Sequence, residues 1–324
     1  MYGPLPALWF GGKDETKLRS LAVSLAVQSN YAGWCLGSFV IPKMIKQEED
    51  FDDVMFVQAA IVSLNLILFI FVYRDPDNTM TSMDNELLGD NVDSKETEMD
   101  ERKITEIITD LLSNTDYVVN VSCVVLLGGV SFAISGILDS VVTSNDERFD
   151  DDDASYMNCG YILSGVLSGV IGGVLIERGL VGKVETLLSF MFVCSTLGLT
   201  LVSFAVYRKH DFDETEIWFA YVLGFVLSGI GALGFCGAAL GLALDAAKNQ
   251  SSVNPGIAVL IPEIGLNAFG AIVTQITGAE FWVCTIVSWS VLAMWVIWLG
   301  YSSFGSGGGG HRYVAATSSS HHGV

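Results

Sequence analysis

The chain has 324 residues, of which 51% are hydrophobic and 16% are charged, and its mean hydropathy is +0.49. This composition excludes an ordinary soluble domain, whose core holds fewer apolar residues, and favours a protein that lies in a lipid bilayer. The net charge of −20 excludes nucleic acid as a partner, because phosphate groups repel an acidic surface.

Apolar runs follow one another along the chain, and each is close to the length that crosses a bilayer. Only helices satisfy their own backbone groups in lipid, so the sequence predicts about eight transmembrane helices and an all-α polytopic membrane fold. The predicted spans are residues 21–41, 54–73, 117–138, 157–176, 184–207, 217–244, 257–279 and 281–300.

Polar stretches divide the chain into four parts. Residues 1–73 hold the first two predicted helices, and residues 117–301 hold a bundle of six. Residues 74–116 form an acidic linker that ends in KITEIITDLL, where apolar residues recur at helical spacing and predict a short amphipathic helix. Residues 302–324 form a Gly/Ser-rich tail that we expect to be disordered.

Charge predicts the orientation of these parts. Lys and Arg are more frequent on the side of the linker, so the linker and both termini are predicted to be cytoplasmic. The opposite loops are acidic, at residues 47–53, 145–153 and 211–216. These acidic residues either concentrate cations at an outer vestibule or simply keep the loops in water.

The residues typical of catalytic and metal sites do not form a recognisable pattern. The six cysteines are scattered singly through apolar runs without metal-ligand spacing, and we interpret them as small buried apolar residues. Three of the four histidines lie in the Gly/Ser-rich tail. With no nucleophilic triad and no phosphate-binding glycine loop, we expect no enzyme activity, no bound metal and no cofactor.

Two helices, a long inner loop and six helices resemble helices five to twelve of the major facilitator superfamily. Local strings resemble the branch related to the feline leukaemia virus subgroup C receptor, known for choline, ethanolamine and proposed haem transport. These strings are ALWFGGKDE (7–15), like the end of helix four, SNYAGWCLGSFVIP (29–42), like helix five, GGVSFAISGILDSVV (128–142), like helix seven, and GYILSGVLSGVIGGVLIERG (160–179), like helix eight.

The helix-five motif carries the resemblance most clearly. Asn30, Gly33, Gly37 and Pro42 keep the spacing of that branch, whereas Tyr31 replaces a glutamine. The resemblance implies that Met1 stands within helix four, that the first part of the N-terminal half is missing, and that translation begins upstream. It also implies a cavity lined in part by helices five, seven, eight, ten and eleven.

The helix resembling helix five holds polar and aromatic residues at mid-depth, where polar groups are costly enough to suggest a function. Asn30 and Trp34 stand at i and i+4 and therefore share one face. An aromatic ring beside amides suits an organic cation. Alternatively, Asn30 and Tyr31 only join helices through hydrogen bonds. The candidates for contact with substrate on this helix are Gln28, Asn30, Tyr31 and Trp34.

Further candidates lie on the helices resembling helices eight and eleven. Tyr161 either reaches the cavity or belongs to an interfacial aromatic belt. Glu263 is a candidate for proton coupling or cation contact, or it marks the start of its helix near the inner surface. Asn267 stands four residues after Glu263, and Gln275 follows on the same helix.

Two acidic residues are candidate gates. Asp139 lies near the outer end of its predicted helix, and Asp245 lies near the inner end of another. Each either closes the cavity or is a charge at the membrane surface.

The predicted function is transmembrane transport of a small organic solute by alternating access, for example of an organic cation such as choline. The expected partners are the lipid bilayer and that solute. One alternative is a non-transporting membrane receptor or assembly subunit with eight helices. Another is a facilitator that carries a vitamin, a sugar or an organic anion.

Overall fold

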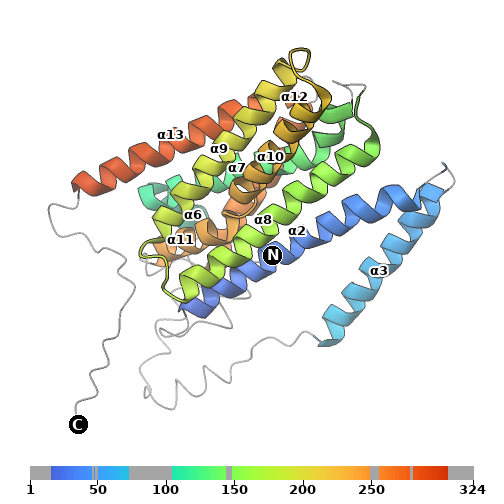
Figure 1. Cartoon of the computed structure of the whole chain (residues 1–324). Helices are drawn as coiled ribbons and strands as arrows, with labels where there is room; N and C mark the ends of the chain where they lie inside the picture. The colour runs from blue at the N-terminus through green and yellow to red at the C-terminus, as the bar shows by residue number, and fades with distance from the viewer. Residues whose placement is uncertain are drawn as a thin grey trace, which may run out of the picture. The chain divides into compact units, whose positions relative to one another are not determined.

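The computed structural model describes residues 16–45, 47, 50–72, 104–143, 148–248, 255–277 and 280–305. These residues form helices joined by turns and loops (Figure 1). Three predicted features lie outside the described residues, namely the end of a fourth helix at 1–10, the acidic linker up to residue 103 and the Gly/Ser-rich tail from residue 306.

The chain forms two compact units. The small unit, residues 36–110, contains the end of α2 (Thr16–Met44), α3 (Asp50–Val72) and most of the amphipathic helix α6 (Ile104–Ser113). The large unit contains residues 1–35 and 111–324. Its further helices are α7 (Thr115–Thr143), α8 (Asp151–Glu177), α9 (Val184–Tyr207), α10 (Glu214–Ala232), α11 (Cys236–Lys248), α12 (Pro255–Thr277) and α13 (Trp282–Gly305).

Among the described residues, seven helical segments are long and apolar enough to cross a membrane, and α10 and α11 together make one of them. The segment predicted at 257–279 contains such a helix, at Ile257–Thr277, despite Pro262 and Glu263. The 29-residue helix α2 is not among the seven, which fits the polar run Gln28–Asn30 in its middle. The chain is an integral multi-pass membrane protein with an all-α polytopic fold, as predicted.

The span predicted over 217–244 consists of two helices rather than one. The helix stops at Ala232 and restarts at Cys236, with a turn over 233–235 between them. Glycine is frequent here, and each glycine in a helix costs about 1 kcal/mol relative to alanine. In lipid, the backbone groups freed by such a break require other partners.

Small residues let the helices of the large unit approach closely. On α7, a Cβ atom at Gly129 would stand 3.0 Å from the backbone nitrogen of Gly270 on α12. Contacts this close require glycine on both helices and place α12 directly against α7. The register of α12 against α7 therefore follows from these glycines.

The last helix, α13, is joined to α9 by short hydrogen bonds between side chains. The hydroxyls of Ser203 and Thr285 are 2.7 Å apart, and the Trp295 indole donates to the Ser189 hydroxyl over 2.8 Å. Hydrogen bonds between membrane helices contribute about 1 kcal/mol each. These two helices thus form a firmly connected part of the bundle.

Candidate functional site

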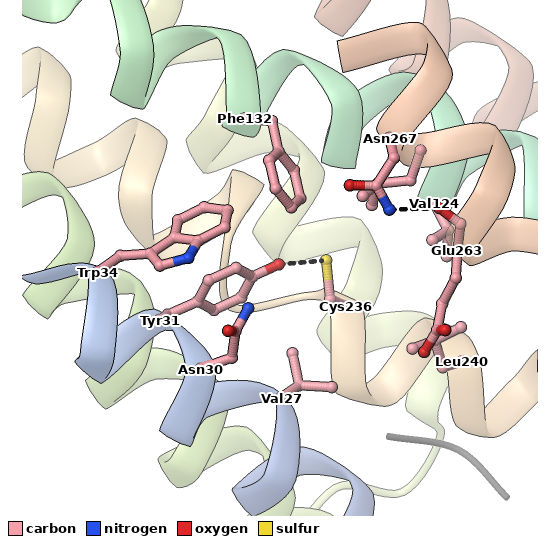
Figure 2. Close-up of a pocket in the computed structure, with 11 residues that line it drawn as sticks. Val27, Asn30, Tyr31, Trp34, Val124, Phe132, Cys236, Leu240, Glu263 and Asn267 are labelled. Carbon is pink, nitrogen blue, oxygen red and sulfur yellow. Dashed lines mark hydrogen bonds between the residues drawn. The ribbon is translucent and has the colours of Figure 1, made fainter. Parts of the chain in front are cut away.

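A pocket of about 320 Å³ lies inside the large unit, between the first part of α2 and helices α7, α11 and α12 (Figure 2). Four α2 residues contribute to it, at the spacing i, i+3, i+4 and i+7 that defines one face of a helix. They are Val27, Asn30, Tyr31 and Trp34.

One wall of the pocket is aromatic. The ring centroids of Tyr31 and Trp34 are 5.3 Å apart, and those of Trp34 and Phe132 are 4.4 Å apart, both edge to face. Such edge-to-face pairs hold rings in fixed orientations. Figure 2 shows the three rings gathered on the same side, with α2 supplying two and α7 the third.

The opposite wall carries polar groups from α12 (Figure 2). Glu263 and Asn267 are one helical turn apart and both line the pocket. The Asn267 amide donates a 2.7 Å hydrogen bond to the Glu263 backbone carbonyl, which ties the two residues together along α12. Glu263 and Asn267 thus line the side of the pocket away from the aromatic rings, and the Glu263 carboxylate lies beside Leu240 (Figure 2).

A proline immediately precedes Glu263 and changes the backbone of α12. Pro262 has no N–H group, so the carbonyl of Ala258, four residues earlier, loses its helical donor. The buried Tyr117 hydroxyl on α7 donates to this carbonyl over 2.7 Å. The Tyr117 hydroxyl therefore replaces the donor that the Ala258 carbonyl lacks, and it holds the turn of α12 that carries Glu263.

The break between α10 and α11 forms another edge of the pocket. Cys236, the first residue of α11, lines the pocket and accepts a 3.4 Å hydrogen bond from the Tyr31 hydroxyl. The Ser131 hydroxyl on α7 donates to the Ala232 carbonyl over 2.5 Å. The Ala232 carbonyl, which the break deprives of its helical donor, is thus satisfied by a side chain of a neighbouring helix, as broken helices in membranes require.

The structure brings five of the predicted residues into this pocket, namely Asn30, Tyr31, Trp34, Glu263 and Asn267. Gln28 is buried but lies outside the pocket, where its side-chain nitrogen is 3.5 Å from the Leu233 carbonyl. Its side chain also fills the space beside Gly169 on α8, where an added Cβ would be 2.9 Å from the Gln28 Cγ.

The remaining candidates lie outside the pocket as well. Tyr161 is buried in the core of the bundle, with its ring centroid 6.5 Å from that of Phe225. Gln275 is exposed on α12, and Asp139 is exposed near the end of α7. Asp245 is half-buried near the end of α11.

Sequence reasoning missed the residues that complete the pocket. Phe132 and Cys236 are the most important, because one closes the aromatic wall and the other receives the Tyr31 hydroxyl. Their strings, GGVSFAISG and GALGFCG, are rich in glycine and other small residues. Such residues indicate close contact between helices, but they do not show which side chain enters a pocket.

The size and lining of the pocket restrict what it can bind. A volume of about 320 Å³ is at the lower end for ligand pockets, so only a small ligand fits. Aromatic faces attract cations, and a carboxylate supplies the opposite charge. The arrangement therefore suits a small organic cation better than an anion.

The chain is similar in sequence to several curated membrane transporters. No family model matches the chain. Over 253 residues the chain is 23% identical to the choline/ethanolamine transporter FLVCR2 of Homo sapiens, covering 71% of the chain and 42% of that protein. Over 246 residues it is also 23% identical to the choline/ethanolamine transporter flvcr2a of Danio rerio, covering 72% of the chain and 48% of that protein.

The chain is similar to these FLVCR2 transporters over 71% and 72% of its length. It aligns with less than half the length of these curated relatives. A third relative, the choline/ethanolamine transporter flvcr2b of Danio rerio, is 22% identical over 242 residues, covering 71% of the chain and 46% of that protein. The resemblance to this branch is thus confirmed by alignments that extend over most of the chain.

Proposed function

We propose that this protein takes part in transport of a small organic cation of the choline or ethanolamine class across a membrane, and that the pocket holds the cation. The observation that carries the proposal is the placement of Glu263 opposite the aromatic wall of Tyr31, Trp34 and Phe132. The names of the relatives, which are choline/ethanolamine transporters, support the same class of solute.

The two walls suit the two properties of a quaternary ammonium group. Such a group has no N–H to donate, so it binds through its charge and its methyl surface. The faces of the Trp34 and Tyr31 rings carry partial negative charge, which attracts the positive charge spread over the methyl groups. In a membrane interior a charged carboxylate is costly, and a bound cation offsets the charge of Glu263.

The amides account for the other end of a choline or ethanolamine molecule. Asn30 on α2 and Asn267 on α12 both line the pocket. Each amide carries a donor and an acceptor, so either one can bind a hydroxyl group. An amino-alcohol therefore finds partners for its charge and for its hydroxyl in the same cavity.

The position of the pocket supports alternating access. By the resemblance, α2 belongs to one half of a facilitator, and α7, α11 and α12 belong to the other. Binding at the meeting point of two halves, near interrupted helices, is typical of secondary transporters. Both the α10–α11 break and Pro262 lie next to the pocket, so its walls have natural hinge points.

The test is uptake of radiolabelled choline and ethanolamine into lipid vesicles that contain the purified protein, compared with vesicles that lack it. Time-dependent accumulation inside the vesicles supports transport. Saturable binding of choline to the protein without accumulation indicates the receptor or assembly role instead. Uptake of a sugar or an organic anion, with no effect of choline on that uptake, contradicts the proposed substrate class.

A further inference from the structure

Two cysteines from different helices meet beside the pocket. The Cys35 sulfur on α2 and the Cys159 sulfur on α8 are 3.2 Å apart, and both residues are partly buried. This separation is about 1.2 Å longer than the sulfur–sulfur bond of a disulfide. The two sulfurs therefore have to approach each other by only about 1.2 Å to form a bond.

This meeting is part of a longer contact between α2 and α8. Further along the same two helices, the Gln28 side chain fills the space beside Gly169, and the Ser24 side chain fills the space beside Gly173. The residue numbers rise along α2 as they fall along α8, so the two helices run antiparallel. Cys35 and Cys159 therefore face each other in a register that several turns support.

Two hydrogen bonds that join α2 to the break between α10 and α11 are weak. The bond from Gln28 to the Leu233 carbonyl is 3.5 Å long, and the bond from Tyr31 to Cys236 ends on sulfur. Sulfur is a weak acceptor, and a 3.5 Å contact is at the limit of a hydrogen bond. By contrast, α13 is joined to α9 by bonds of 2.7 and 2.8 Å.

We propose that Cys35 and Cys159 are a redox modification site, at which a neutral peroxide forms a reversible disulfide that fixes α2 to α8. The site is distinct from the pocket, but its effect rests on the proposed function. Cys35 follows Trp34 directly, so the disulfide holds the aromatic wall in one position. Solute exchange stops, because α2 no longer moves relative to the bundle.

The chemistry balances with hydrogen peroxide as the oxidant. The sulfur of one cysteine attacks a peroxide oxygen and becomes a sulfenic acid, and the departing hydroxide takes the thiol proton to form water. The sulfur of the other cysteine then displaces hydroxide from the sulfenic sulfur, and that hydroxide takes the second thiol proton. Two thiols and one peroxide give one disulfide and two water molecules.

The test begins with a structural readout that does not depend on transport. The purified protein in lipid vesicles is exposed to hydrogen peroxide, its free thiols are alkylated after unfolding, and its peptides are analysed by mass spectrometry. We expect a peptide pair that joins Cys35 to Cys159 and separates after treatment with dithiothreitol. The variants Cys35→Ser and Cys159→Ser each lose this pair. Cys123→Ser, which changes a fully buried cysteine on α7, retains it.

Choline uptake is measured on the same vesicles. Uptake falls in proportion to the linked fraction, returns with dithiothreitol, and resists peroxide in Cys35→Ser and in Cys35→Ala. The proposed redox site is contradicted if the thiols of Cys35 and Cys159 both remain free after prolonged exposure to hydrogen peroxide, or if they are oxidised to separate sulfinic acids. The proposed effect of the disulfide on transport is contradicted if protein in which Cys35 and Cys159 are fully linked takes up choline normally. If the reduced protein has no uptake, the proposed transport function fails while the peptide readout still decides the site.

Discussion

The Tyr31 hydroxyl donates a hydrogen bond to the Cys236 sulfur over 3.4 Å, which joins α2 to the first residue of α11. Both residues are buried and both line the pocket. The contact therefore links the aromatic wall directly to the break between α10 and α11. A movement at this break changes the position of the rings that we propose to bind the cation.

Trp34 is the ring that contacts both other aromatic residues of the wall. A cation over an aromatic ring in a desolvated site gains about 1 to 2 kcal/mol. We expect Trp34→Ala to weaken choline binding by about 5- to 30-fold. Equilibrium binding of radiolabelled choline measures this effect. Trp218→Ala, which removes a 40% exposed ring on α10, serves as the control and leaves binding unchanged. Equal affinity of the Trp34 variant and the natural protein contradicts the role of the ring.

Glu263 supplies the negative charge of the pocket. The substitution Glu263→Gln keeps the shape of the side chain and removes this charge. Two charges about 4 Å apart attract each other by about 4 kcal/mol at an effective dielectric constant of about 20. We therefore expect choline affinity to fall at least about tenfold, which corresponds to about 1.4 kcal/mol. The comparison is with Glu177→Gln at the end of α8, which lies outside the pocket. If both variants bind choline alike, Glu263 is not the counter-charge.

The hydrogen bond from Tyr117 to the Ala258 carbonyl exists because Pro262 leaves that carbonyl without a donor. Tyr117→Phe leaves a buried acceptor unsatisfied, which costs about 1 to 3 kcal/mol of unfolding free energy. In a Pro262→Ala background we expect a smaller loss, because the alanine supplies an N–H to the same carbonyl. Thermal unfolding in detergent measures both losses.

The control for this pair of Tyr117 and Pro262 variants is Tyr301→Phe, which changes a 73% exposed tyrosine on α13. It is expected to leave the melting temperature unchanged. Equal losses for Tyr117→Phe in the presence and absence of Pro262 indicate that the tyrosine and the proline act independently.

Gly169 on α8 leaves room for the Gln28 side chain. Gly169→Ala places a methyl group in the space of that side chain, and we expect it to displace α2 and weaken choline binding. Adding Gln28→Ala removes the clash and restores binding at least in part. Gly300→Ala is the matched control, because an added Cβ there meets no atom within 4 Å apart from its chain neighbours and the backbone of its own helix. A Gly169 variant with unchanged choline affinity contradicts the role of this contact in placing α2.

The fold was predictable because a bilayer imposes length and apolarity on each helix. The faces of the pocket were partly predictable as well. The pairs Asn30 with Trp34 and Glu263 with Asn267 follow from their spacing of four residues, and the structure places each pair on one wall.

Other features depend on how the helices pack, which spacing alone does not give. Gln28 precedes Asn30 by two residues, which is about 200° around a helix, so the two side chains face different neighbours. Gln275 is eight residues beyond Asn267, about 12 Å further along α12 and past the pocket. Phe132 and Cys236 enter the pocket only because glycines bring α7, α11 and α12 together. No periodicity in the chain marks these residues.

The most direct measurement is a comparison of the binding of choline and of 3,3-dimethylbutan-1-ol, its neutral carbon isostere, to the purified protein. The two molecules have the same shape and the same hydroxyl group, so they differ in the charge that faces Glu263 and the aromatic wall. We expect choline to bind at least about tenfold more tightly, a difference of about 1.4 kcal/mol, and Glu263→Gln together with Trp34→Ala to abolish the preference. Equal binding of the two molecules, or tighter binding of the alcohol, would contradict a cation site in this pocket.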